Sequence, residues 1–214
     1  MSGSACLVYL LRHGSTAANR ELPYRLQGRG LDLPLDGVGI DQSRRVADAL
    51  ANLPIDAVFT SPLRRARDTA GYVGAGRALE PTLVPEIVEA NVGRWEGLTW
   101  AGAKEQDPSL YEAFHNRPGT EPYPGGESYL DAQRRMIPAL AALAANNAGR
   151  RIVVVSHNVT NRAYLAGLLG IPIDRARSIR QANCGISIIR YEGGGTSVET
   201  LNSTFHLAES TGGR

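Results

Sequence analysis

The sequence has little cysteine and almost no lysine. The two cysteines, Cys6 and Cys184, follow no metal-binding or redox spacing, so we expect reduced packing residues in a cytoplasmic protein. Lys104 is the only lysine among 23 basic residues, so nearly all of the positive charge is arginine. Arginine favours bidentate contacts with phosphate or carboxylate, although a composition bias accounts for most of these residues. The net charge of +2 is too small to indicate nucleic-acid binding.

The signals of several other protein classes are missing. Residues 1–4 have no basic region or long apolar run, so we expect no signal peptide, and no stretch reaches the length of a membrane span. No glycine-rich loop ends in Lys-Ser or Lys-Thr, and no Gly-x-Gly-x-x-Gly follows the first predicted strand. The glycines of 71–76 follow a helical pattern and indicate its end. No side chains have metal-ligand spacing, so we expect no metal and no other cofactor.

The most informative stretch that is present is the one at 7–16. Its five apolar residues at 7–11 predict a buried strand, which is followed by Arg12 and His13. Open α/β sheets bind ligands at the carboxyl ends of their strands, and Gly14 permits a sharp turn there. Taken alone, the pattern is better explained as a buried strand with two polar end residues, and later stretches of the chain change that preference.

Strand and helix patterns alternate along most of the chain. Further strands are predicted at 55–60, 79–84 and 151–156, and a hairpin at 185–191 and 196–201. Helices are predicted at 36–53, from Ser61-Pro62 to about 74, at 128–147 and at 158–169. These patterns predict a three-layer, doubly wound α/β fold with a mainly parallel sheet and an antiparallel edge.

The chain shows no internal repeat and no linker, so we expect one domain over 1–214. The segment 85–126 holds both tryptophans and is broken by Gly and Pro, which predicts an irregular insertion that acts as a lid. The residues at 209–214 predict a loose tail.

Polar residues follow three of the predicted strands. Arg12 and His13 follow the first, Ser61 follows the second with Arg64 one turn further on, and His157 follows the strand at 151–156. Burying so much positive charge is costly without an anion. A phosphate supplies that anion, and a neutral imidazole beside it can attack phosphorus.

Six motifs occur in a fixed order over about 7–207. They are Leu11-Arg12-His13-Gly14-Ser15-Thr16 with Asn19, Gln27-Gly28 with Asp32-Leu33-Pro34-Leu35, Thr60-Ser61-Pro62-Leu63-Arg64-Arg65-Ala66 with Thr69-Ala70, Glu89-Ala90-Asn91-Val92-Gly93-Arg94-Trp95-Glu96-Gly97, Pro124-Gly125-Gly126-Glu127-Ser128, and Val155-Ser156-His157. Together they resemble the histidine phosphatase superfamily, which also contains the cofactor-dependent phosphoglycerate mutases.

The resemblance implies catalytic roles for the matched residues. His13 is implied as the nucleophile that forms a phosphohistidine, and the residues that hold the phosphoryl oxygens are Arg12, Arg64 and His157. Glu89 is implied as the proton donor to the leaving oxygen, because of its spacing from 93–97. Glu86 and Glu96 are the alternative candidates for this proton donor.

The implied substrate contacts are Asn19, Gln27, Gly28, Ser15 and Asn158. Asn158 contacts the ligand or caps the following helix, and the capping interpretation is favoured. Six loop arginines are placed where they can face the pocket: Arg20, Arg25, Arg29, Arg94, Arg117 and Arg162.

The modest length and the motif at 93–97 resemble the phosphatase branch of the superfamily. The resemblance therefore implies a metal-independent phosphomonoesterase for a small, anionic phosphorylated metabolite, with no nucleic-acid or membrane partner and with a homodimer as the default assembly. The alternatives are a cofactor-dependent phosphoglycerate mutase, which shields the phosphohistidine from water, and a non-catalytic phosphate-binding regulatory module. The regulatory module predicts the loss of His13 or Glu89, and both are present.

Overall fold

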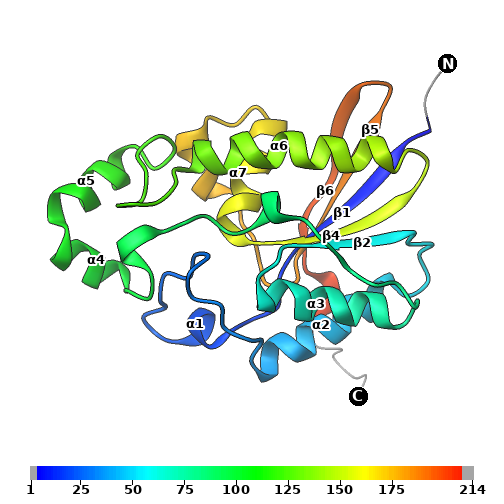
Figure 1. Cartoon of the computed structure of the whole chain (residues 1–214), viewed down its shortest axis with the longest axis horizontal. Helices are drawn as coiled ribbons and strands as arrows, with labels where there is room; N and C mark the ends of the chain where they lie inside the picture. Colours follow the sequence, from blue (N-terminus) through cyan, green and yellow to red (C-terminus); the bar gives the residue numbers. More distant parts are fainter. Residues whose placement is uncertain (1–3, 209–214) are drawn as a thin grey trace.

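The structure is a computed structural model that describes residues 4–208, so the tail predicted at 209–214 lies outside the described residues. Its strands are β1 (Cys6–Arg12), β2 (Ala57–Thr60), β3 (Thr82–Leu83), β4 (Arg151–Ser156), β5 (Ile186–Glu192) and β6 (Gly195–Ser203). They form one sheet in the order β3-β2-β4-β1-β5-β6 (Figure 1). The first four pair in parallel, and β5 and β6 are antiparallel. The predicted sheet with its antiparallel edge is confirmed.

Helices cover both faces of the sheet. The four main helices are α2 (Gly37–Leu50), α3 (Arg64–Ala75), α6 (Tyr129–Asn146) and α7 (Asn158–Leu168). Figure 1 shows α2 and α3 on one side of the sheet and α6 on the other. The buried apolar residues accordingly form two clusters, one on each face of the sheet. The layers follow the sequence, because each helix has one apolar stripe and the central strands are apolar on both faces.

The register of the central strands brings their polar end residues together. Arg12 pairs with Ser156 across β1 and β4, so His13 and His157 follow side by side. Thr60 pairs with Val155 across β2 and β4, and the Ser61 amide donates to the Val155 carbonyl over 3.0 Å. The three strands therefore deliver their next residues to one place.

Two predicted elements differ from the observed ones. The helix expected from Ser61-Pro62 begins at Arg64, because Leu63 has an extended backbone and keeps Pro62 outside the helix. The strand expected at 79–84 is reduced to Thr82–Leu83. Both residues of this strand are exposed at the sheet edge, where it pairs with β2 alone.

The segment 85–126 contains four short elements and an aromatic cluster. The elements are the 3₁₀ helices η1 (Pro85–Ile87) and η2 (Gly93–Trp95) and the α-helices α4 (Trp100–Gln106) and α5 (Pro108–Asn116). Trp95 is fully buried, and its ring packs against those of Trp100, Tyr111, Phe114 and Tyr123. Figure 1 shows α4 and α5 beyond the carboxyl ends of the strands.

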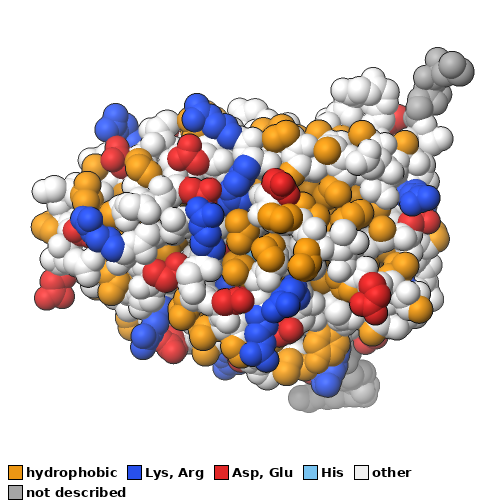
Figure 2. Space-filling view, viewed as in Figure 1, with side chains coloured by type: hydrophobic (Ala, Val, Ile, Leu, Met, Phe, Trp, Pro, Cys, Tyr) orange, Lys and Arg blue, Asp and Glu red, His pale blue; other side chains and the backbone are white. Residues whose placement is uncertain are grey.

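The remaining short helices are α1 (Ala17–Arg20), η3 (Ile173–Ser178) and η4 (Phe205–Leu207). Within residues 4–208, no helix has the length and apolar character needed to cross a membrane. On the face shown in Figure 2, basic and acidic side chains are interspersed.

Candidate active site

His13 lies just after β1 with its ring nearly buried, at 3% exposure. Its Nδ1 is 2.7 Å from the carbonyl oxygen of Gly14. A carbonyl can only accept, so Nδ1 carries the proton and Nε2 keeps its lone pair. The Nε of Arg65 donates to that lone pair over 3.2 Å. The backbone turn thus selects the tautomer in which Nε2 is nucleophilic.

Both site histidines are neutral near pH 7. Burial lowers the pKa of His13 well below its ordinary value of 6.5, and the charges of Arg65 and Arg12 lower it further. Burial also lowers the pKa of His157 well below 6.5, with Arg65 as the next contributor. A neutral His13 is the form that can act as a nucleophile.

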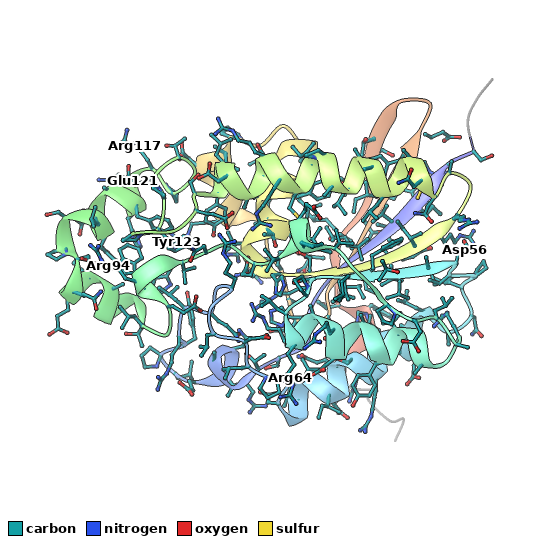
Figure 3. All side chains as sticks on the ribbon, in the orientation of Figure 1. Asp56, Arg64, Arg94, Arg117, Glu121 and Tyr123 are labelled. Carbon is teal, nitrogen blue, oxygen red and sulfur yellow. The ribbon has the colours of Figure 1, made fainter. Side chains whose placement is uncertain are left out.

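Arg65, and not Arg64, reaches the site. Its side chain is buried, and besides His13 it donates to the carbonyls of Gly28 (2.8 Å) and Leu31 (3.2 Å). The Arg64 side chain is 56% exposed and lies 3.6 Å from the Asp68 carboxylate. Figure 3 labels Arg64 beside α3, away from Tyr123. The sequence-based placement of Arg64 at the phosphate site is therefore wrong.

Helical spacing contains the signal that separates the two arginines. Arg65 precedes Thr69 by four residues and Val73 by eight, so it lies on the face of α3 that packs against the sheet. Arg64 precedes Asp68 by four residues, on the solvent face.

Arg12 is the last residue of β1, and its side chain lines the same pocket as His13. Its Nη1 donates to the carbonyl of Gln181 over 2.7 Å, which holds one end of the guanidinium. Its Nε is buried and has no hydrogen-bond partner among the described residues. Burial lowers the pKa of Arg12 to about 10, opposed by Glu89, so the group remains charged at neutral pH.

His157 is fully buried beside His13, with the two ring centroids 5.1 Å apart. Its Nε2 is 2.7 Å from the Oγ of Ser61, and its Nδ1 has no partner within residues 4–208. Buried polar atoms are usually paired, so the orphaned Nδ1 and the orphaned Nε of Arg12 are candidate contacts for a ligand oxygen.

Glu89 lies at the amino end of α7, 3% exposed. Its carboxylate accepts from the amides of Val159 (3.1 Å), Thr160 (3.2 Å) and Ala90 (2.8 Å). A helix amino terminus is a favourable place for a carboxylate. Glu89 therefore supplies the cap of this helix, and the interpretation of Asn158 as its cap is wrong. The Oδ1 of Asn158 is instead buried beside the pocket, with no partner among the described residues.

The two competing glutamates do not line the pocket. Glu86 is exposed, and Glu96 accepts from the amides of Gly28 (2.7 Å) and Gly30 (3.1 Å). Glu96 therefore holds the loop that supports Arg65, and of the three glutamates only Glu89 lines the same pocket as His13.

The pocket is a cavity of about 110 Å³ at the carboxyl ends of the strands. Of the sequence-predicted site residues, it is lined by Arg12, His13, Asn19, Gln27, Glu89 and Asn158. Two of the six loop arginines, Arg25 and Arg162, also line it. Sequence reasoning missed a further set: Tyr24, Trp100, Tyr123, Tyr129 and Arg177. These come from segments that only folding brings to the site, and no local motif marks them.

Ser15 and Gly28 are not pocket residues, which corrects their prediction as substrate contacts. The Ser15 hydroxyl donates to the Asp36 carboxylate over 3.2 Å. A Cβ on Gly28 would lie 2.7 Å from the Ala90 carbonyl oxygen, so this glycine permits close packing beneath the site.

Asn19 and Gln27 line the pocket while bonding to neighbouring residues. Gln27 accepts from the Thr16 hydroxyl over 2.8 Å, and Asn19 accepts from the Asn183 amide over 3.2 Å. Asn183 also donates to the His13 carbonyl over 2.9 Å, a support that sequence reasoning missed.

Three of the loop arginines are engaged away from the pocket. Arg29 lies near Glu127, Arg94 binds Asp107 and Arg117 binds Glu121, as Figure 3 shows for the last pair. Arg20 is exposed and does not line the pocket.

The sequence matches the family model described as histidine phosphatase superfamily (branch 1) over residues 8–204. The chain belongs to the histidine phosphatase superfamily. This confirms the resemblance inferred from the six motifs. It also places the buried His13 in a family of phosphoryl-transfer enzymes.

Several known proteins are similar to the chain over most of its length. A probable phosphoglycerate mutase GpmB of Escherichia fergusonii is 32% identical over 205 residues, covering 94% of each chain. The bifunctional protein Rv2228c of Mycobacterium tuberculosis is 34% identical over 96% of this chain, which spans 56% of that protein. The crystal structure of a phosphoserine phosphatase from Entamoeba histolytica, in complex with 3-phosphoglyceric acid, matches with a TM-score of 0.84 at 27% identity, covering 95% of this chain and 100% of the other.

Proposed function

We propose that this protein is a phosphomonoesterase that hydrolyses a small, anionic phosphorylated metabolite through a phosphohistidine at His13. The observation that carries the proposal is the His13 tautomer: Nδ1–H is bonded to the Gly14 carbonyl, and the Nε2 lone pair faces Arg65. A neutral, oriented imidazole beside fixed positive charge is suited to attack on phosphorus.

In the first step, Nε2 of His13 attacks the phosphorus in line with the ester oxygen. The N–P bond forms as the P–O bond to the leaving group breaks. Arg12 and Arg65 stabilise the charge on the phosphoryl oxygens, and His157 donates to one of them. Glu89 takes up a proton together with the substrate dianion and transfers it to the leaving oxygen, which departs as an alcohol.

In the second step, water attacks the phosphohistidine. Glu89, now a carboxylate, takes a proton from this water as the O–P bond forms and the N–P bond breaks. Inorganic phosphate leaves, and His13 returns to its neutral form. The two arginines thus supply the charge stabilisation that a metal ion supplies in other phosphoryl-transfer sites.

Because the arginines are part of the chain, we expect turnover to need no divalent metal. Within the described residues, no group of three or more His, Cys, Asp or Glu side chains could hold a metal ion. Exhaustive chelation should leave the rate of phosphate release from p-nitrophenyl phosphate unchanged. A loss of activity that magnesium or zinc restores would contradict this expectation.

The proposed intermediate is tested by quenching the protein with ³²P-labelled substrate under basic conditions. The label should be acid-labile and base-stable, and absent from the His13→Ala variant. His115→Ala is the matched control, since His115 bonds to its own helix through Tyr111 and does not line the pocket. Labelling that persists in His13→Ala would show that another group is the nucleophile.

A second candidate is a phosphoglycerate mutase, which the 32% identity to GpmB favours. A mutase returns the phosphoryl group to a second acceptor oxygen and excludes water. Incubation with 3-phosphoglycerate distinguishes the two: a phosphatase releases inorganic phosphate, whereas a mutase accumulates 2-phosphoglycerate with little phosphate release.

A further inference from the structure

Two arginines line the pocket without a carboxylate partner among the described residues. Arg162 lies in α7 and Arg177 lies in η3, and both are half-buried. Arg162 donates through Nε to the carbonyl of Ile179 over 2.8 Å, which fixes its direction. Half-buried charges that lack a partner are costly, so a site with two of them is suited to an anion.

Arg177 is held in place by aromatic rings. Its Cζ lies 5.1 Å from the ring centroid of Trp100 and 5.9 Å from that of Phe114. Such cation–π contacts position the guanidinium without using its N–H donors. Both rings belong to the segment 85–126, so this segment orients a charge at the pocket.

The other positive groups of the pocket already have partners or a role. Arg12, with Arg65 behind the pocket, serves the phosphoryl group that is transferred, and Arg25 forms an ion pair with Glu21. Arg162 and Arg177 remain. Burial raises the pKa of Tyr129, and the positive charges of Arg162 and Arg177 lower it. Both guanidinium groups therefore lie near the Tyr129 hydroxyl, which also lines the pocket.

On the basis of the proposed function, we infer that Arg162 and Arg177 bind a second anionic group on the leaving-group side of the substrate. That group is a carboxylate or a second phosphate, because a guanidinium binds the oxygens of either in pairs. Arg177 is then a residue that determines specificity: it selects substrates that carry two anionic groups, without touching the phosphorus.

The test measures binding to His13→Ala, which cannot turn over the ligand. Calorimetry compares three ligands with one carbon skeleton: glycerol 3-phosphate, 3-phosphoglycerate and glycerol 1,3-bisphosphate. We expect at least one of the doubly anionic ligands to bind ten times more tightly than glycerol 3-phosphate, about 1.4 kcal/mol. Which one does so identifies the second group as a carboxylate or a phosphate.

Adding Arg177→Gln should reduce this preference to less than threefold, because the doubly anionic ligand loses more affinity than glycerol 3-phosphate. Arg177→Lys keeps the charge and should retain part of the preference. Arg175→Gln is the matched control, because Arg175 lies in the same short helix but is exposed and outside the pocket. Equal affinities for all three ligands, no binding of any of them, or a preference that survives Arg177→Gln would overturn the inference.

A kinetic measurement separates this inference from the proposed function. In the otherwise unmodified protein, Arg177→Gln should lower kcat/KM for the preferred doubly anionic ester at least tenfold more than kcat/KM for p-nitrophenyl phosphate, which has no second anionic group, and Arg175→Gln should leave both values within twofold. If the unmodified protein releases no phosphate and forms no phosphohistidine, the proposed function fails. The binding comparison still decides whether the second anion site exists.

Discussion

At the scale of single residues, Arg65 binds three acceptors at once: the Nε2 of His13 and the carbonyls of Gly28 and Leu31. Each contact uses a different nitrogen of the guanidinium, whereas a lysine carries its three donors on a single nitrogen. In the proposed mechanism, the donor that points at His13 binds an oxygen of the phosphoryl group when the substrate is present. The neighbouring carbonyls keep the plane of the guanidinium fixed.

We therefore expect Arg65→Lys to lower kcat/KM for p-nitrophenyl phosphate at least tenfold, about 1.4 kcal/mol of transition-state stabilisation. A lysine brings one compact charge and cannot make the three contacts. Arg64→Lys, at the exposed neighbouring position, is the matched control and should stay within twofold. An equal loss of kcat/KM in both variants would mean that the substitutions act by destabilising α3 and not by weakening contacts to the phosphate.

In the proposed mechanism Glu89 gives its proton to the leaving oxygen, so the effect of replacing it should depend on the leaving group. Glu89→Gln keeps the shape and removes the transferable proton. An alkoxide leaves poorly without that proton, whereas p-nitrophenolate is a stable anion. Hydrolysis of glycerol 3-phosphate should therefore slow much more than hydrolysis of p-nitrophenyl phosphate.

Steady-state and burst-phase rates are both needed for this comparison, because breakdown of the phosphohistidine can limit turnover. Glu86→Gln, at an exposed position outside the pocket, is the control and should change neither ester. If Glu89→Gln slowed both esters equally in both phases, the proton donor would have to be another group.

At the scale of elements, the start of α2 packs directly on the backbone that follows His13. A Cβ on Gly39 would lie 2.1 Å from the carbonyl oxygen of Ser15, and one on Gly14 would lie 2.6 Å from the carbonyl oxygen of Gly39. The two backbones approach this closely because both positions lack a side chain. The start of α2 thus lies directly against the turn that follows His13 and limits its movement.

Gly39→Ala should destabilise the protein by about 1–3 kcal/mol, the usual range for overpacking, and should lower activity by moving the turn. Gly37→Ala in the same helix is the control, because a Cβ there meets nothing within 4 Å. Urea unfolding and the p-nitrophenyl phosphate assay measure the two effects. A Gly39→Ala protein as stable as Gly37→Ala would show that the loop can retreat from α2.

At the scale of the whole molecule, folding buries His13 and His157 away from water, and burial keeps both side chains neutral. The pKa values of His13 and His157 are both far below 6.5 in the folded protein, first because of burial and then because of nearby arginines. Below pH 6.5 the unfolded chain binds protons that the folded chain does not. The free energy of unfolding should therefore rise with pH up to about 6.5 and fall as the solution is acidified.

The slope for two such groups approaches about 2.7 kcal/mol per pH unit, twice the value for one proton. Chemical denaturation between pH 7.5 and pH 5 measures it. The double variant His13→Gln, His157→Gln should lose most of this slope. A wild-type stability that stays constant over the interval would contradict neutral, buried histidines.

Much of this architecture could be read from the chain itself. Apolar runs such as 7–11 and 152–155 form central strands because only burial on both faces suits them. Strand ends then gather at one edge of the sheet, so the meeting of His13 with His157 follows from local pattern and a topological rule. The spacing of Glu89 from its motif also led to the glutamate that lines the pocket.

The tertiary structure decided what local pattern leaves open. Helical spacing puts Arg64 and Arg65 on different faces of α3, but only tertiary packing brings Arg65 within hydrogen-bond distance of His13. Asn158 is of a residue type that often caps helices, yet the amides at the start of α7 donate to the carboxylate of Glu89, 69 residues earlier. Arg177 belongs to no motif and acquires its place from rings of another segment. The positions of these three side chains depend on contacts between residues far apart in the chain. Local sequence patterns carry information only about residues that are close in sequence.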